Sequence, residues 1–182
     1  MTVRSTPADT LRAEAAPRRL AAYATPLEAL TAVDSAERAE AAFALGMQGD
    51  GAAVGALRRA LQDGEARVRV EAALALARLG EEALGKETLG AELQGEFFAG
   101  APLRAARGLA LLGDASGYAR VLEALRSEMP SNRLEAVAAL PEFAPLGIDV
   151  TEPLTQATSD SEEIVRSDAL AALRGLQGED RS

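Results

Sequence analysis

Arginine and carboxylate side chains recur at fixed places along the chain and have the clearest potential for chemistry. The repeat arginines, as we call them, are Arg38, Arg69, Arg104, Arg133 and Arg166, at intervals of 31, 35, 29 and 33 residues. Acids stand two residues after four of them, at Glu40, Glu71, Glu135 and Asp168. A guanidinium presents a fixed fork of donors to a carboxylate or phosphate, and paired carboxylates could exchange protons with a substrate.

Catalysis is disfavoured by what accompanies these residues. The chain has no His and no Cys, so it lacks the commonest general base, thiolate nucleophiles and Cys or His metal ligands. Acids carried by successive packed helices lie about 10 Å apart, which is too far for a shared proton. We therefore expect a protein that is not an enzyme, with no catalytic residues, no metal site and no cofactor.

The composition indicates a helical fold. Of 182 residues, 48% are apolar but only 3% are aromatic, and Ala and Leu dominate the apolar set. Small and unbranched side chains favour helix over strand. We predict an all-α protein.

Each copy of the period reads as two helices. In the copy shown best, Val68, Ala72, Leu76 and Leu79 form one apolar stripe of the second helix, which ends at Gly80. The first helix is expected from about residue 52 to 61, with a turn at residues 63–64.

Five copies of the period cover residues 26–176. A single helical hairpin is unstable alone, so we expect the five hairpins to stack on one another. Residues 1–25 do not continue the period and are expected to cap the stack, with part of the segment flexible. Residues 177–182 are expected to form a polar tail.

The segment from Val68 to Gly80, Val-Arg-x-Glu-Ala-Ala-x-Ala-Leu-x-x-Leu-Gly, resembles the HEAT repeat in its short bacterial form, the phycocyanobilin-lyase HEAT-like repeat. The resemblance implies a right-handed α-solenoid (an alpha-alpha superhelix) with the second helices on its concave side. It also implies a scaffold for other macromolecules, although some relatives are subunits of enzymes that attach or detach bilins.

The same resemblance implies that the repeat arginines pair with a turn aspartate of a neighbouring repeat. Asp63 and Asp160 stand six residues before Arg69 and Arg166, but Phe98 and Ser127 hold that place before the third and fourth repeat arginines. We favour a structural arginine ladder over an anion-binding row.

The acids point away from the ladder, since two residues turn a helix by about 200°. They are candidates for a partner-binding row on the concave face or its rim; the alternative is a solvated polar face. Arg107 stands where the other copies have Ala, so either its helix is rotated or its side chain projects into the groove. The predicted partner-binding residues are Glu40, Glu71, Arg107, Glu135 and Asp168.

The net charge of −9 opposes nucleic acid and anionic membranes, and no secretory signal or membrane span is evident. We expect a cytoplasmic protein that binds a basic or helical segment of a protein partner, with its oligomeric state open. The alternatives are a bilin-lyase subunit or pigment-handling factor, and a DNA-binding, glycosylase-like HEAT protein. The last of these needs a cationic, aromatic groove that the sequence lacks.

Overall fold

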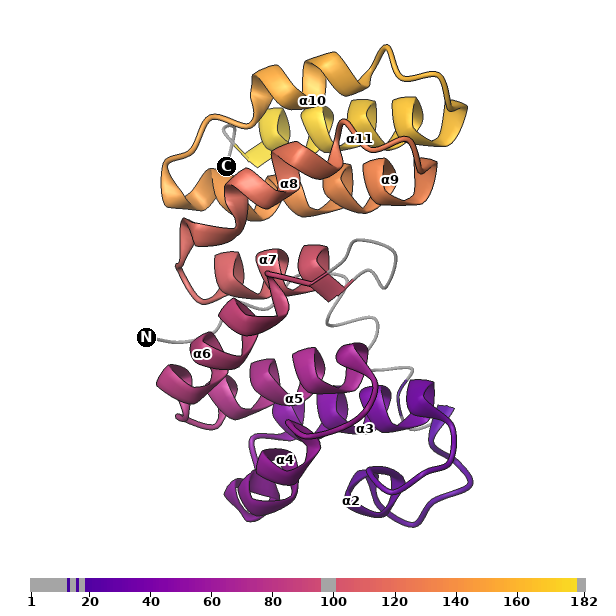
Figure 1. Ribbon diagram of the computed structural model, residues 1–182, viewed down its shortest axis with the longest axis vertical. Coiled ribbons are helices and arrows are strands. Elements are labelled where there is room, and N and C mark those ends of the chain that lie inside the picture. The colour runs from indigo at the N-terminus through magenta and orange to yellow at the C-terminus, as the bar shows by residue number, and fades with distance from the viewer. Residues whose placement is uncertain (1–12, 14–15, 17–18, 96–100, 180–182) are drawn as a thin grey trace. The chain divides into compact units, whose positions relative to one another are not determined.

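The computed structural model describes residues 13, 16, 19–95 and 101–179. Every regular element in these ranges is a helix (Figure 1). The predicted all-α helical-repeat fold is therefore confirmed. Contacts divide the chain into two compact units, residues 1–92 (unit 1) and 93–182 (unit 2), which are described separately.

Unit 1 contains two pairs of packed helices and a further helix. Its elements are α2 (Pro26–Ala29), α3 (Ser35–Gln48), the 3-10 turn η1 (Gly51–Ala53), α4 (Val54–Ala60), α5 (Ala66–Arg78) and α6 (Glu82–Glu92). The second helices α3 and α5 pack side by side, and α6 packs on α5 (Figure 1). α2 and α4 cover α3 and α5 respectively, as the predicted hairpins require.

Local signals in the sequence set these helix ends. Thr25 Oγ1 accepts a hydrogen bond from the Glu28 amide (3.3 Å), and Glu28 Oε2 accepts one from the Ala24 amide (3.1 Å). This reciprocal cap fixes the start of α2. At the end of α5, Gly80 adopts φ +98°, a left-handed conformation that favours glycine.

Very close helix approach in unit 1 depends on small side chains. A Cβ atom on Gly46 of α3 would lie 2.7 Å from Ala75 Cα of α5, and one on Gly85 of α6 would lie 2.7 Å from the Ala73 carbonyl oxygen. Any larger residue at either glycine must push two helices apart. The alanine-rich composition thus has a structural explanation.

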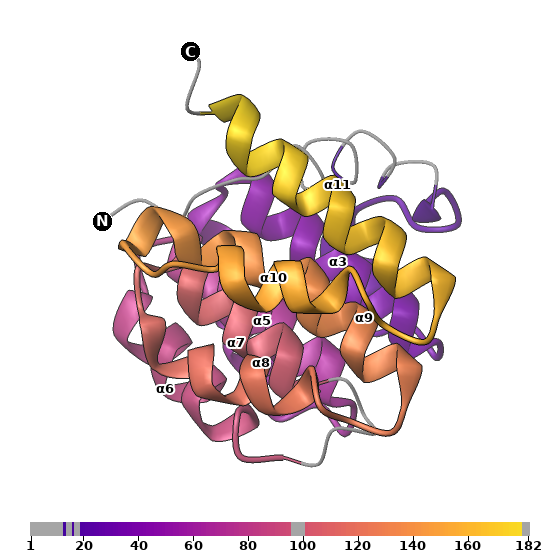
Figure 2. The same cartoon turned by 90° about the horizontal axis from the view of Figure 1, so that it is seen from above.

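Unit 2 repeats the hairpin of two packed helices. Its elements are α7 (Ala101–Leu111), η3 (Ala115–Gly117), α8 (Tyr118–Ala124), α9 (Pro130–Ala139), η4 (Leu140–Leu146), α10 (Thr151–Ala157) and α11 (Glu163–Glu179). Figure 2 shows α10 crossing α11, on which it packs. Pro141 follows the end of α9, and the chain continues as a 3-10 helix in which Phe143 is fully buried, with its ring centroid 5.3 Å from that of Tyr118.

The two predicted terminal segments are described only in part. Ala16 and Leu20 are buried against Ala29, Ala41 and Ala44, which places the described end of the N-terminal segment on α3. At the other end, α11 continues to Glu179, so the predicted tail begins inside a helix. The Phe97–Phe98 pair lies outside the described residues.

Candidate functional site

Arg38 joins two successive hairpins of unit 1. Its Nε and Nη2 donate to the two carboxylate oxygens of Asp63 at 2.7 and 2.9 Å. Its Nη1 donates to the carbonyl oxygens of Ala32 and Val33, six and five residues before it. One guanidinium thus fixes its own turn and binds the next turn, in the two-pronged geometry that makes Arg–carboxylate pairs strong.

Arg133 does the same in unit 2. It donates to both oxygens of Asp160 at 2.7 and 2.9 Å, and to the carbonyls of Ser127 and Glu128 at 3.0 and 3.2 Å. The predicted pairing of repeat arginines with the turn aspartates of neighbouring repeats is confirmed at Asp63 and Asp160. Ser127 in place of Asp does not matter to Arg133 itself, because Arg133 needs only the backbone oxygen of that residue.

Arg69 keeps the ladder by a different route. It donates to the Asp63 and Gly64 carbonyls at 2.8 and 3.1 Å, but its carboxylate is Glu92, at 2.5 and 2.9 Å. Sequence reasoning missed Glu92 because the repeat register pointed to Phe98. The available signal was the acid at the end of α6, whose longer side chain reaches an arginine that a turn aspartate would otherwise bind.

Two repeat arginines depart from this pattern. Arg104 is 41% exposed and lies 3.7 Å from Glu135, which is 38% exposed. Arg166 donates from Nη1 to the carbonyls of Asp160 and Ser161, both at 2.8 Å, but binds no carboxylate among the described residues. The sequence register alone does not reveal this difference.

The aspartates of the ladder are held as anions. The hydrogen bonds from Arg38 lower the pKa of Asp63, and a backbone amide adds to the effect. The hydrogen bonds from Arg133 lower the pKa of Asp160 to about 2. Because Arg38, Arg69 and Arg133 have their forks occupied by protein carboxylates, they have a structural role and offer no open anion site.

Two of the predicted partner-binding acids lie in the interior of unit 1. Glu40 and Glu71 are 4% and 6% exposed. Glu40 lies 3.1 Å from Arg19 of the N-terminal segment. In unit 1 the acids therefore form no open row, because neighbouring groups cover the face that the sequence assigned to solvent.

The other three predicted residues are accessible to different degrees. Glu135 is half-buried and pairs loosely with Arg104, and Asp168 is exposed on α11. Arg107 is half-exposed and donates from Nε and Nη2 to Glu142 Oε1 at 3.1 Å. The Arg107 side chain thus reaches the carboxylate of Glu142. This contact compensates the positive charge that stands where the other copies have alanine.

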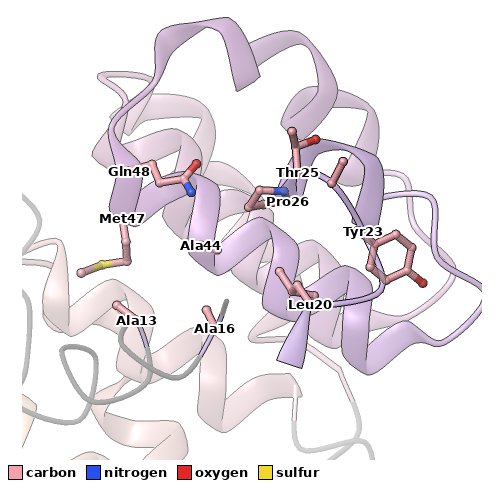
Figure 3. Close-up of a pocket in the computed structure, with 10 residues that line it drawn as sticks. Ala13, Ala16, Leu20, Tyr23, Thr25, Pro26, Ala44, Met47 and Gln48 are labelled. Carbon is pink, nitrogen blue, oxygen red and sulfur yellow. The ribbon is translucent and has the colours of Figure 1, made fainter. Parts of the chain in front are cut away.

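A pocket of about 380 Å³ lies between the C-terminal half of α3 and the described part of the N-terminal segment. Figure 3 shows Leu20, Ala44 and Met47 around it, with Tyr23 and Gln48 contributing polar groups. The Tyr23 hydroxyl donates to Glu37 at 2.7 Å, and this contact raises the tyrosine's pKa. The described lining therefore suits apolar contact and holds no acid–base pair.

The geometry defines a class of protein: helical hairpins joined in series by guanidinium–carboxylate pairs between their turns. Residues 23–86 match the family model for HEAT repeats, so the chain carries HEAT repeats in that segment. No curated protein matches this chain. Among the described residues, no group of three or more acids could hold a metal ion, and no helix has the length and apolar character to cross a bilayer.

Proposed function

We propose that this protein is a non-catalytic scaffold that binds a cationic segment of another protein through unit 2. HEAT repeats commonly serve as protein-interaction scaffolds, which supports the general role. The specific observation is that Asp168 is exposed and the Glu135 side chain is 38% exposed, at the same register on the second helices α11 and α9.

The arrangement suits recognition of a basic segment. Glu135 and Asp168 belong to a chain of net charge −9, so a cationic partner is attracted before contact. Arg104 lies 3.7 Å from Glu135, and both side chains are partly exposed. An arginine or lysine of the partner can therefore take the place of Arg104 beside Glu135. A pre-formed helical surface loses little conformational freedom on binding.

Affinity capture from native lysate, followed by mass spectrometry, tests this proposal. The variant Glu135→Lys/Asp168→Lys reverses both accessible acids. The control Glu87→Lys/Glu128→Lys makes the same change in net charge at two exposed acids that do not occupy this register. The proposal requires proteins captured by wild type to be lost with the first variant and kept with the control; equal capture by both variants contradicts it. Thermal unfolding of each variant verifies that both remain folded.

The finer resemblance, to the bilin-lyase type of HEAT-like repeat, remains a separate prediction about function. It is tested by adding a free bilin to the purified protein and recording its visible absorbance. A shifted and intensified spectrum would support pigment handling, and an unchanged spectrum would contradict it.

A further inference from the structure

The surface of α11 beside Arg166 differs from the equivalent surface of α3, α5 and α9, the second helices whose repeat arginines bind carboxylates. Four residues after the repeat arginine, Ala42, Ala73 and Val137 are 0%, 0% and 1% exposed. The equivalent residue of α11, Leu170, is 45% exposed. The largest side chain of this set is therefore the one in contact with solvent.

Close contacts in unit 1 identify what this surface is for. A Cβ atom on Gly85 of α6 would meet Ala73 and Ala77 of α5, four and eight residues after Arg69. The same α6 supplies Glu92 to the fork of Arg69. This surface of a second helix thus receives the next helix along the chain, and the repeat arginine receives its carboxylate.

α11 has both parts of this interface: the surface residue four positions after the repeat arginine, and the repeat arginine itself. No helix among the described residues occupies them as α6 occupies α5. Arg166 already has its Nη1 on its own turn, as Arg38, Arg69 and Arg133 do, while its Nε and Nη2 bind no carboxylate in the described ranges. Arg174, eight residues after Arg166, is exposed, and among the described residues its Nε donates to the Leu170 carbonyl of its own helix. Arg166, Leu170 and Arg174 form one stripe, because residues four apart share a helix face.

We infer that the Arg166–Leu170–Arg174 stripe of α11 docks an acidic amphipathic helix of another protein. The helix covers Leu170 with an apolar residue and gives carboxylates to Arg166 and Arg174, as α6 covers α5 and gives Glu92 to Arg69. The stripe carries two arginines in a chain of net charge −9, and these arginines favour an acidic occupant. This surface is distinct from the proposed Glu135 and Asp168 surface, since Asp168 is turned about 200° from Leu170 on the helix.

A second copy of the chain is a poorer occupant on two grounds. A two-fold pairing of α11 across Leu170 sets Arg166 of one copy against Arg174 of the other, and like charges repel. A head-to-tail pairing requires the corresponding face of α3, but Ala41 and Ala44 on that helix are already covered by Ala16 and Leu20 of the same chain.

The test uses a fluorescently labelled peptide of residues 81–95, the acidic segment that holds the equivalent place on α5, and titrates it with the full-length protein. We expect saturable binding that weakens about tenfold or more with Leu170→Glu and with Arg174→Glu. Ala171→Glu adds the same charge to an exposed position of α11 outside the stripe and is expected to leave binding within about twofold. A peptide with Glu92→Gln should bind less tightly than the original.

Several results would overturn the inference. Absence of peptide binding, or equal binding by wild type and Leu170→Glu, excludes the stripe as a site for an acidic helix; the second result would place the peptide at α5 instead. Sedimentation of the full-length protein tests whether a second copy of the chain occupies the stripe. A dimer that Leu170→Glu dissociates would assign the stripe to a second copy of the chain.

Discussion

Arg69 and Arg104 occupy the same position in consecutive copies of the repeat but do different things. Arg69 makes four hydrogen bonds, two to backbone carbonyls and two to Glu92. Arg104 is 41% exposed, and within the described ranges it lies 3.7 Å from the carboxylate of Glu135. The comparison shows that a repeat arginine is held by a two-pronged ion pair where a neighbouring element brings a carboxylate to its fork, as Glu92 does for Arg69.

The largest effect is expected at a carboxylate of an intact ladder position. Asp63→Ala removes two hydrogen bonds to Arg38 and one to the Glu65 amide, leaving a half-buried guanidinium without its anion. We expect a loss of about 3 kcal/mol in the free energy of unfolding. Glu135→Ala removes only the loose contact and should change stability by less than about 0.5 kcal/mol. Urea unfolding followed by circular dichroism measures both, and similar losses would refute the distinction.

Low pH should destabilise the fold at the ladder positions where an arginine binds an aspartate. The folded-state pKa of Asp160 is about 2, below its ordinary 3.8, so the ionised group stabilises the fold above about pH 4 and this contribution is lost as the pH falls towards 2. Asp160→Asn should therefore lower the unfolding temperature at neutral pH, and the gap to wild type should close on acidification. A gap that is constant with pH would show that the Asp160 charge does not stabilise the fold.

Replacing each arginine by lysine separates fork geometry from charge. A lysine keeps the charge but cannot donate to one carboxylate and two carbonyls in a fixed fork. Arg69→Lys is expected to cost about 1 kcal/mol, and Arg104→Lys almost nothing. Thermal unfolding of the two variants compares them directly. A larger loss for Arg104→Lys would mean that Arg104 has a structural role after all.

A small effect is expected at Arg107. Its two donors share one oxygen of Glu142 at 3.1 Å, and its side chain is 36% exposed. Arg107→Gln should change the unfolding free energy by about 0.5 kcal/mol, in the range of exposed ion pairs. A double-mutant cycle with Glu142→Gln measures the coupling; a coupling as large as the loss at Asp63 would place Arg107 among the structural arginines.

Local chemistry in the sequence predicted much of the fold. The spacing of Val68, Ala72 and Leu76 predicted a second helix, and Gly80 predicted its end, because both depend on residues within a few turns of one another. The partnership of Arg38 with Asp63 followed from the resemblance and the register. Glu92 could not be found this way, since its pairing with Arg69 depends on where α6 packs.

The sequence by itself determined an all-helical repeat held by small residues and arginines, since helix periodicity and turn chemistry are local. Tertiary structure alone decided that Glu40 and Glu71 are buried while Asp168 is exposed, although all three follow a repeat arginine by two residues. It also decided that Leu170 is 45% exposed, whereas Ala42, Ala73 and Val137 at the same place are buried. Burial depends on which elements fold back over a helix face, and a repeating sequence assigns the same face to every copy.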